Sequence, residues 1–142
     1  MTTCPAPAVD TLNQGSCFQL TISASVQARW GHRVDDLIHT HAWTVTAVVA
    51  GDPTAEKVHP ADDLEHLLVE VVEPWRGRYL TDVDTGTWKG YQPLVWDREP
   101  TVEEITRRIW DALEPAVPGL VEVSVEEASE FDRRRLVTLR RC

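Results

Sequence analysis

The sequence predicts an α+β domain in which antiparallel strands carry two helices on one face. Residues toward both ends of the chain alternate between apolar and polar side chains, which is typical of half-buried strands. Two central segments instead repeat apolar residues every three or four positions, which is typical of amphipathic helices. The predicted order is strand, strand, helix, long loop, helix, strand, strand.

The first half of the chain is expected to begin with a loose leader over residues 1–14. A half-buried strand is predicted over 18–26 and is followed by a polar segment over 27–36. A second strand is predicted over 39–50, because a Gly-Asp-Pro turn cluster at 51–53 ends the alternation.

The first helix is predicted to open after Pro60 and to stop near Pro74, because proline fits a first helical turn and breaks an interior one. Residues 76–99 form a long irregular segment, and a loop of that length is often functional. The second helix is predicted to begin at Thr101, which with Glu104 has the spacing of a capping box.

Length and composition place limits on the class of protein. The 142 residues suit a single domain over 1–142, and 42% hydrophobic residues are enough for one core. No apolar run is long enough to cross a membrane, and the first residues lack the pattern of a signal peptide, so a cytoplasmic location is expected. The net charge of −9 disfavours nucleic acid as a partner and fits a small-molecule ligand.

Two histidines, His39 and His41, open the second predicted strand. Residues two apart on a strand point to the same face, so both imidazoles can converge on one ligand. Such a pair could form half of a zinc site. It could equally be two polar residues at the end of a sheet, and spacing alone leaves both interpretations open.

Glu127 ends a predicted strand over 120–127, and a last strand is predicted over 135–140. Alternation puts Glu127 on the same face as Val123 and Val125. A carboxylate on an apolar face must pair, accept hydrogen bonds or shift its pKa. The alternative is that the strand has already ended, which would leave Glu127 in solvent.

Four short segments stand out in order along residues 18–127: Ile22-Ser23-Ala24-Ser25-Val26, His39-Thr40-His41-Ala42-Trp43, Pro100-Thr101-Val102-Glu103-Glu104 and Val123-Ser124-Val125-Glu126-Glu127-Ala128. In this order they resemble motifs of the family of 6-pyruvoyl-tetrahydropterin synthase and 6-carboxy-tetrahydropterin synthase. The resemblance implies the tunnelling fold, a four-stranded antiparallel sheet that carries two helices. It also implies a homo-oligomeric barrel, a trimer or a hexamer, with active sites between subunits.

The resemblance also implies a zinc ion held by three histidines, of which two would be His39 and His41. The third position is occupied by Val26, which cannot bind a metal. His32, Asp35 or His59 could complete the site, and the sequence leaves open whether zinc binds. Asp35 also stands where the family has its reactive cysteine, and a carboxylate can serve as a general base there.

Other family positions are altered as well. The Asp-His pair that activates the family's cysteine aligns with Arg76 and Gly77, so the usual proton relay is absent. Glu127 matches the glutamate that accepts hydrogen bonds from the pterin ring. Trp88 and Trp96 lie in the long loop, where exposed aromatics could line a ligand pocket or, equally, a subunit contact.

The sequence thus predicts a divergent enzyme of this family, a lyase, cyclase or isomerase that acts on a small polar or heterocyclic molecule. His39, His41 and Asp35 are the expected acid–base groups, and Glu127, Trp88 and Trp96 are the expected ligand contacts. One alternative is a non-catalytic binding or assembly protein. A second is a genuine pterin or deazapurine-precursor synthase.

Overall fold

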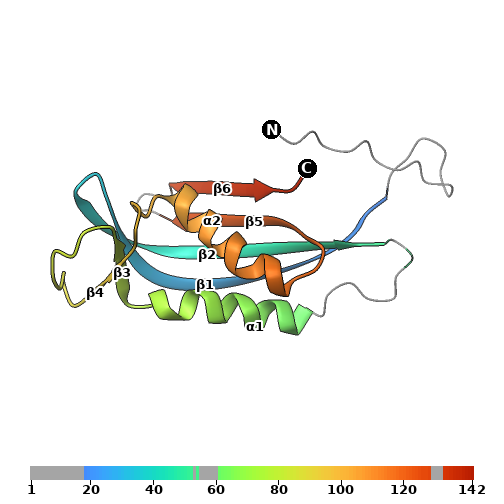
Figure 1. Cartoon of the computed structure of the whole chain (residues 1–142), viewed down its shortest axis with the longest axis horizontal. Helices are drawn as coiled ribbons and strands as arrows, with labels where there is room; N and C mark the ends of the chain where they lie inside the picture. Colours follow the sequence, from blue (N-terminus) through green and yellow to red (C-terminus); the bar gives the residue numbers. More distant parts are fainter. Residues whose placement is uncertain (1–17, 53, 55–60, 129–132) are drawn as a thin grey trace.

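A computed structural model describes residues 18–52, 54, 61–128 and 133–142. Its elements, in chain order, are β1 (Leu20–Val34), β2 (Leu37–Gly51), α1 (Ala61–Val72), η1 (Glu73–Trp75), β3 (Arg78–Thr81), β4 (Gln92–Val95), α2 (Val102–Leu113), η2 (Glu114–Ala116), β5 (Leu120–Ala128) and β6 (Arg134–Arg140). The long β1–β2 hairpin forms the centre of the molecule (Figure 1).

The sheet has six strands in the order β4-β3-β1-β2-β5-β6. The prediction of four antiparallel strands was therefore wrong in number, although the four longer strands do pair antiparallel. The short strands β3 and β4 extend the sheet beyond β1 through parallel pairings. Both lie within 76–99, which was expected to be irregular; each is four residues long, too short to show a period in the sequence.

Strand β1 continues well past the predicted end at Val26, through residues that were expected to form a polar segment. Ala28, Trp30 and His32 stay on the buried face because the two-residue period does not break. The hairpin then closes on Asp35 and Asp36, both with positive φ, 53° and 65°. A two-residue hairpin turn of this kind carries β1 directly into β2.

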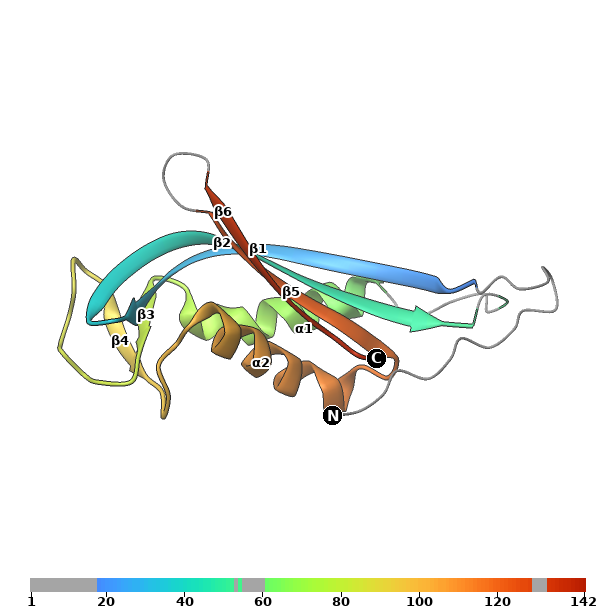
Figure 2. The same ribbon diagram turned by 90° about the horizontal axis from the view of Figure 1, so that it is seen from above.

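Both helices cover the same face of the sheet, as predicted (Figure 2). Helix α1 buries Leu64 and Leu68, and α2 buries Ile105 and Ile109. Thr101 caps α2 as expected, since its Oγ1 accepts a hydrogen bond from the Glu104 backbone N–H at 3.1 Å. None of the helices in the described residues is long and apolar enough to span a membrane.

The core beneath the β1–β2 turn is built from tryptophan rings. Trp30 and Trp43 are fully buried and stack with ring centroids 4.8 Å apart. Trp75 contacts Trp30 edge-on at 5.3 Å, and Trp96 contacts Trp75 at 5.6 Å. These large rings make a rigid base for the polar side chains above them.

Candidate functional site

Each of the four longer strands places one polar residue in a row on the helix-covered face. His32 comes from β1, His41 from β2, Glu127 from β5 and Arg135 from β6. Glu127 pairs directly with Arg135. His32 and His41 are diagonal neighbours on the same face, since His41 pairs with Trp30, and Glu127 lies diagonal to His41, since it pairs with Trp43. The predicted burial of Glu127 is confirmed, because this residue is 7% exposed.

His32, His41 and Glu127 form a compact cluster whose potential ligand atoms all lie within 4.8 Å of one another. Nε2 of His32 and Nε2 of His41 are each 3.6 Å from Oε2 of Glu127. That oxygen is buried and accepts no hydrogen bond from the described part of the chain. A buried carboxylate oxygen without a donor is costly unless a cation or ligand satisfies it.

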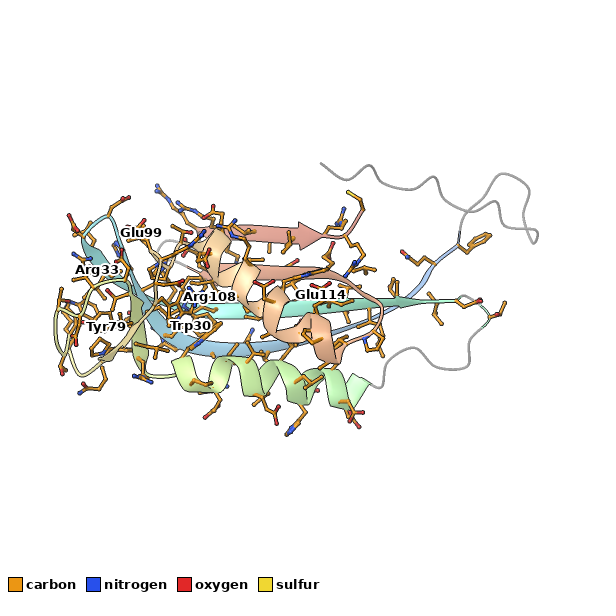
Figure 3. The ribbon with its side chains drawn as sticks, in the orientation of Figure 1. Trp30, Arg33, Tyr79, Glu99, Arg108 and Glu114 are labelled. Carbon is orange, nitrogen blue, oxygen red and sulfur yellow. The ribbon has the colours of Figure 1, made fainter. Side chains whose placement is uncertain are left out.

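The segment before α2 orients His32. Its Nδ1 lies 2.8 Å from the carbonyl oxygen of Pro100, so the neutral ring donates from Nδ1 and keeps its Nε2 lone pair toward Glu127. The next residue back, Glu99, accepts a hydrogen bond from the Asp35 backbone N–H at 3.1 Å. Arg33 and Glu99 lie together at this end of the molecule (Figure 3). The segment before α2 therefore contacts both a histidine and the β1–β2 turn.

Burial favours the uncharged form of both clustered imidazoles. It lowers the pKa of His32, an effect that the Pro100 carbonyl partly opposes. It also lowers the pKa of His41, where the Glu127 carboxylate opposes the shift. The rings of His32 and His41 both pack edge-on against Trp43, with ring centroids 5.0 and 5.3 Å from that of the indole. Trp43 therefore shields both imidazoles from water on that side. Neutral histidine is the form that binds metal ions.

These shifts predict that the zinc-free protein loses stability as the pH falls. The folded pKa values of His32 and His41 lie below the ordinary value of 6.5, so the unfolded chain binds more protons under acid conditions. The contribution of the two histidines to the free energy of unfolding is fully present above pH 6.5. It declines as the pH falls toward the folded pKa values, by at most about 1.4 kcal/mol per pH unit for each proton. Urea unfolding in EDTA from about pH 8 to about pH 5.5 measures this decline.

His32→Asn should make the decline of stability with falling pH shallower, because it removes one of the two imidazoles whose protonation is disfavoured in the folded protein. His66→Asn provides the control, since His66 has a 74% exposed side chain on α1. An equal slope for wild type and His32→Asn would contradict the prediction.

A cavity of about 660 Å³ opens beside the cluster. The expected acid–base residues His39, His41 and Asp35 all line it, and so does Glu127. His32 lines the cavity too, although the sequence indicated it only as one of three residues that could supply the third zinc ligand. The other lining residues are Val34, Leu37 and the consecutive arginines Arg133, Arg134 and Arg135.

The structure changes the expected ligand set. Val26 is a buried core residue paired with Val45, far down the strand from His41, and takes no part in the site. His32 supplies a buried imidazole beside the half-buried His41 instead, and it lies opposite His39 in the hairpin register. His39 is exposed on the cavity wall, with its ring centroid 6.0 Å from that of His41, and lies outside the three-residue cluster. His59 lies outside the described residues.

Neither Trp88 nor Trp96 lines the cavity beside the cluster. Trp96 is 8% exposed, not an exposed loop aromatic, and the Arg108 guanidinium lies 4.2 Å above its ring. Trp88 is half-buried and contacts Tyr91 within the loop. Their roles in ligand binding stay predictions. Gly77, at the position of the missing relay histidine, occupies a turn with φ of 67°.

The comparison with known families agrees with this architecture. The sequence profile of the 6-pyruvoyl tetrahydropterin synthase family matches residues 18–134. The chain belongs to the 6-pyruvoyl tetrahydropterin synthase family. The predicted family is thereby confirmed, and the match covers β1, β2 and β5 and ends at the first residue of β6. No curated protein matches the chain.

Solved structures of the 6-pyruvoyl tetrahydropterin synthase family share the fold. The Caenorhabditis elegans 6-pyruvoyl tetrahydropterin synthase superposes with a TM-score of 0.63 at 17% identity, covering 87% of this chain and 96% of that one. The Plasmodium vivax 6-pyruvoyl tetrahydropterin synthase gives 0.57 at 11% identity, with 87% and 98% covered. An uncharacterised protein from Wolinella succinogenes gives 0.57 at 14% identity, with 84% and 98% covered. Identities this low establish the fold alone.

Proposed function

We propose that this chain is a metal-dependent lyase, cyclase or isomerase that acts by acid–base chemistry on a small polar or heterocyclic molecule. The observation that carries the proposal is the cluster of His32, His41 and Glu127 at the wall of the cavity. Burial disfavours the charged form of both imidazoles, and one oxygen of the buried Glu127 carboxylate has no donor among the described residues. Such a set is unfavourable unless it binds a metal ion or a ligand.

The donor set fits zinc. Two histidine nitrogens and one carboxylate oxygen are common zinc ligands, and catalytic sites characteristically use three protein ligands. His32 is also held by the Pro100 carbonyl, the kind of outer contact that fixes a ligating histidine. His32, His41 and Glu127 would therefore hold the ion. A bound zinc ion would polarise a ligand oxygen and lower the pKa of an attached proton.

The acid–base steps fall to residues of the cavity wall that lie outside this cluster. His39 is exposed beside His41, and Asp35 lies at the adjacent turn, so both can reach a ligand in the cavity. Histidine exchanges protons readily at neutral pH. Asp35 is held in place through its backbone N–H by Glu99. These two residues are the proposed proton donor and acceptor, in place of the family's cysteine relay.

We also propose that the working form is a homo-oligomer, a trimer or hexamer. Strand β3 pairs with only Gly31 and His32 of β1, so the rest of that edge, 20–30, lacks a strand neighbour in the described part of the chain. Strand β6 forms the opposite end of the sheet. Two open edges of antiparallel strands suit pairing between copies. Sedimentation of the purified protein measures the assembly directly.

Metal analysis and deuterium exchange test the proposed chemistry together. Untagged protein is expected to carry about one zinc ion per chain, and its loss in EDTA should be reversible. Incubation with 7,8-dihydroneopterin and its triphosphate in D₂O should give a new product or deuterium at a carbon atom, because acid–base lyases and isomerases exchange carbon-bound protons with solvent. Glu127→Gln should abolish both the zinc and the exchange.

The two alternatives give different results. Formation of the 6-pyruvoyl product would identify a genuine pterin synthase. Binding of such heterocycles without exchange or product, in zinc-loaded protein, would favour a non-catalytic binding protein. Absence of zinc from the purified protein, with no uptake on addition, would contradict the metal-dependent proposal.

A further inference from the structure

The β1–β2 turn that carries Asp35 has a backbone conformation that its sequence does not favour. Asp35 and Asp36 both have positive φ, 53° and 65°. Residues with a Cβ are strained there, and two-residue hairpin turns of this type usually have glycine at the second position. Of the two aspartates only Asp35 lines the cavity, whereas the Asp36 carboxylate pairs with Arg33 at 2.8 Å. Contacts from outside the turn therefore contribute to its conformation.

Glu99 supplies such a contact from a segment 64 residues further along the chain. Its Oε2 accepts a hydrogen bond from the Asp35 backbone N–H at 3.1 Å. The N–H of a turn residue lies outside the strand ladder, so this carboxylate provides an acceptor that the hairpin itself does not. The Glu99 side chain is half-buried and lies at the end of the molecule that carries the turn (Figure 3).

The residue after Glu99 contacts the metal-binding cluster. The Pro100 carbonyl oxygen is 2.8 Å from Nδ1 of His32. Because the residue before a proline is confined to extended backbone, Glu99 has little freedom relative to Pro100. The Glu99 carbonyl also accepts a hydrogen bond from the Thr101 backbone N–H at 2.9 Å, and Thr101 caps α2. Two consecutive residues of a constrained segment thus contact a proposed metal ligand and the turn that carries Asp35.

We propose that Glu99 is a positioning residue of the candidate site, which holds Asp35 at the cavity and, through Pro100, couples that position to metal binding at His32. A histidine that binds a metal through one ring nitrogen donates a stronger hydrogen bond from the other, which here contacts Pro100. The inference rests on the proposed function for the metal and for the role of Asp35. Its own content is the connection between the two.

Solvent exchange of the Asp35 amide, measured by NMR in EDTA-treated and in zinc-loaded protein, tests this coupling without an assay of activity. In wild type, zinc is expected to slow the exchange at Asp35 by at least about fivefold. Glu99→Ala should remove that zinc dependence at Asp35. The amide of Val45 in β2 is the internal reference, and zinc should protect it equally in both proteins.

Two further variants separate the contact from a general effect of mutation. Glu99→Gln keeps an oxygen acceptor and should retain most of the zinc dependence, since it loses only the contribution of the charge. Glu103→Ala is the matched control, because Glu103 is an exposed glutamate in the first turn of α2, and it should behave as wild type. Because coupling is reciprocal, Glu99→Ala should also bind zinc about fivefold more weakly, although all three proposed ligands remain.

Deuterium incorporation from D₂O into 7,8-dihydroneopterin triphosphate gives a second measurement of the positioning role. Glu99→Ala should lower the rate at saturating substrate by about tenfold or more, because a displaced acid–base group slows the chemical step. The substrate concentration at half saturation should change by less than about twofold, since binding contacts are retained. Glu99→Gln should restore most of the rate.

The possible failures of the two proposals are distinguishable. Exchange at Asp35 that is equal with and without zinc in wild type, or equally zinc-dependent in Glu99→Ala, would overturn the coupling. Deuterium incorporation by Glu99→Ala at the wild-type rate would overturn the positioning role. A wild-type protein that takes up no zinc, or that incorporates no deuterium, would instead contradict the proposed function, and this inference with it.

Discussion

Replacing His32 with alanine is expected to lower the zinc affinity of the protein by more than about a hundredfold. The variant would remove one of three proposed ligands and leave the Pro100 carbonyl without its ring partner. His41 and Glu127 alone form a weak two-ligand site. Competition with a chromophoric zinc chelator measures the affinity, and substitution by cobalt gives a visible spectrum that reports the ligand set independently of any activity.

His66→Ala is the matched control for this experiment, because His66 is an exposed histidine that contacts Glu70 on the same helix. Its zinc affinity should equal that of wild type. Val26→Ala supplies a second comparison, since family resemblance placed the third ligand at that position. Unchanged zinc affinity in His32→Ala would show that the metal uses His39 or another group instead.

Replacing Trp43 with alanine is expected to destabilise the fold by about 3–5 kcal/mol. Trp43 is fully buried, stacks on Trp30, and donates a hydrogen bond from its Nε1 to the Trp30 carbonyl at 3.0 Å. Its removal would leave a cavity that rigid neighbours cannot fill. It would also remove the ring against which His32 and His41 pack, so zinc affinity should fall with stability.

Urea unfolding measures the first effect and chelator competition the second. Trp88→Ala serves as control, because Trp88 is half-buried in the 82–91 loop away from the cavity, and its loss should cost less than about 1 kcal/mol. Trp43→Phe should lie between wild type and Trp43→Ala. Similar losses for Trp43→Ala and Trp88→Ala would contradict the claim that the tryptophan stack supports the site.

The sequence was most informative where one periodic pattern decided the structure. The parity of β5 put Glu127 on the buried face, and the capping residue Thr101 located the start of α2. Both signals are local, since each depends on residues within a few positions. The family match added the connection between segments that are far apart in the chain.

The same reasoning failed at His32 for a physical reason. Gln27, Arg29 and Arg33 made the end of β1 look like a loop, although the buried residues between them kept the period of two. Continued alternation from Val26 to His32 was the signal that could have extended the strand. The cavity itself could not be predicted, because it depends on the register of three strand pairings and on the turn at Asp35.

That row of one residue per strand has a consequence for folding. A slip of a single residue in any of the three antiparallel pairings would turn one member of the row to the opposite face. A metal ion that binds only the correctly registered hairpins would penalise every such misalignment by its full binding free energy. Zinc binding would then favour the correct register of these strands over shifted ones. Zinc would also slow amide hydrogen exchange in β1, β2 and β5 together, and not in one strand alone.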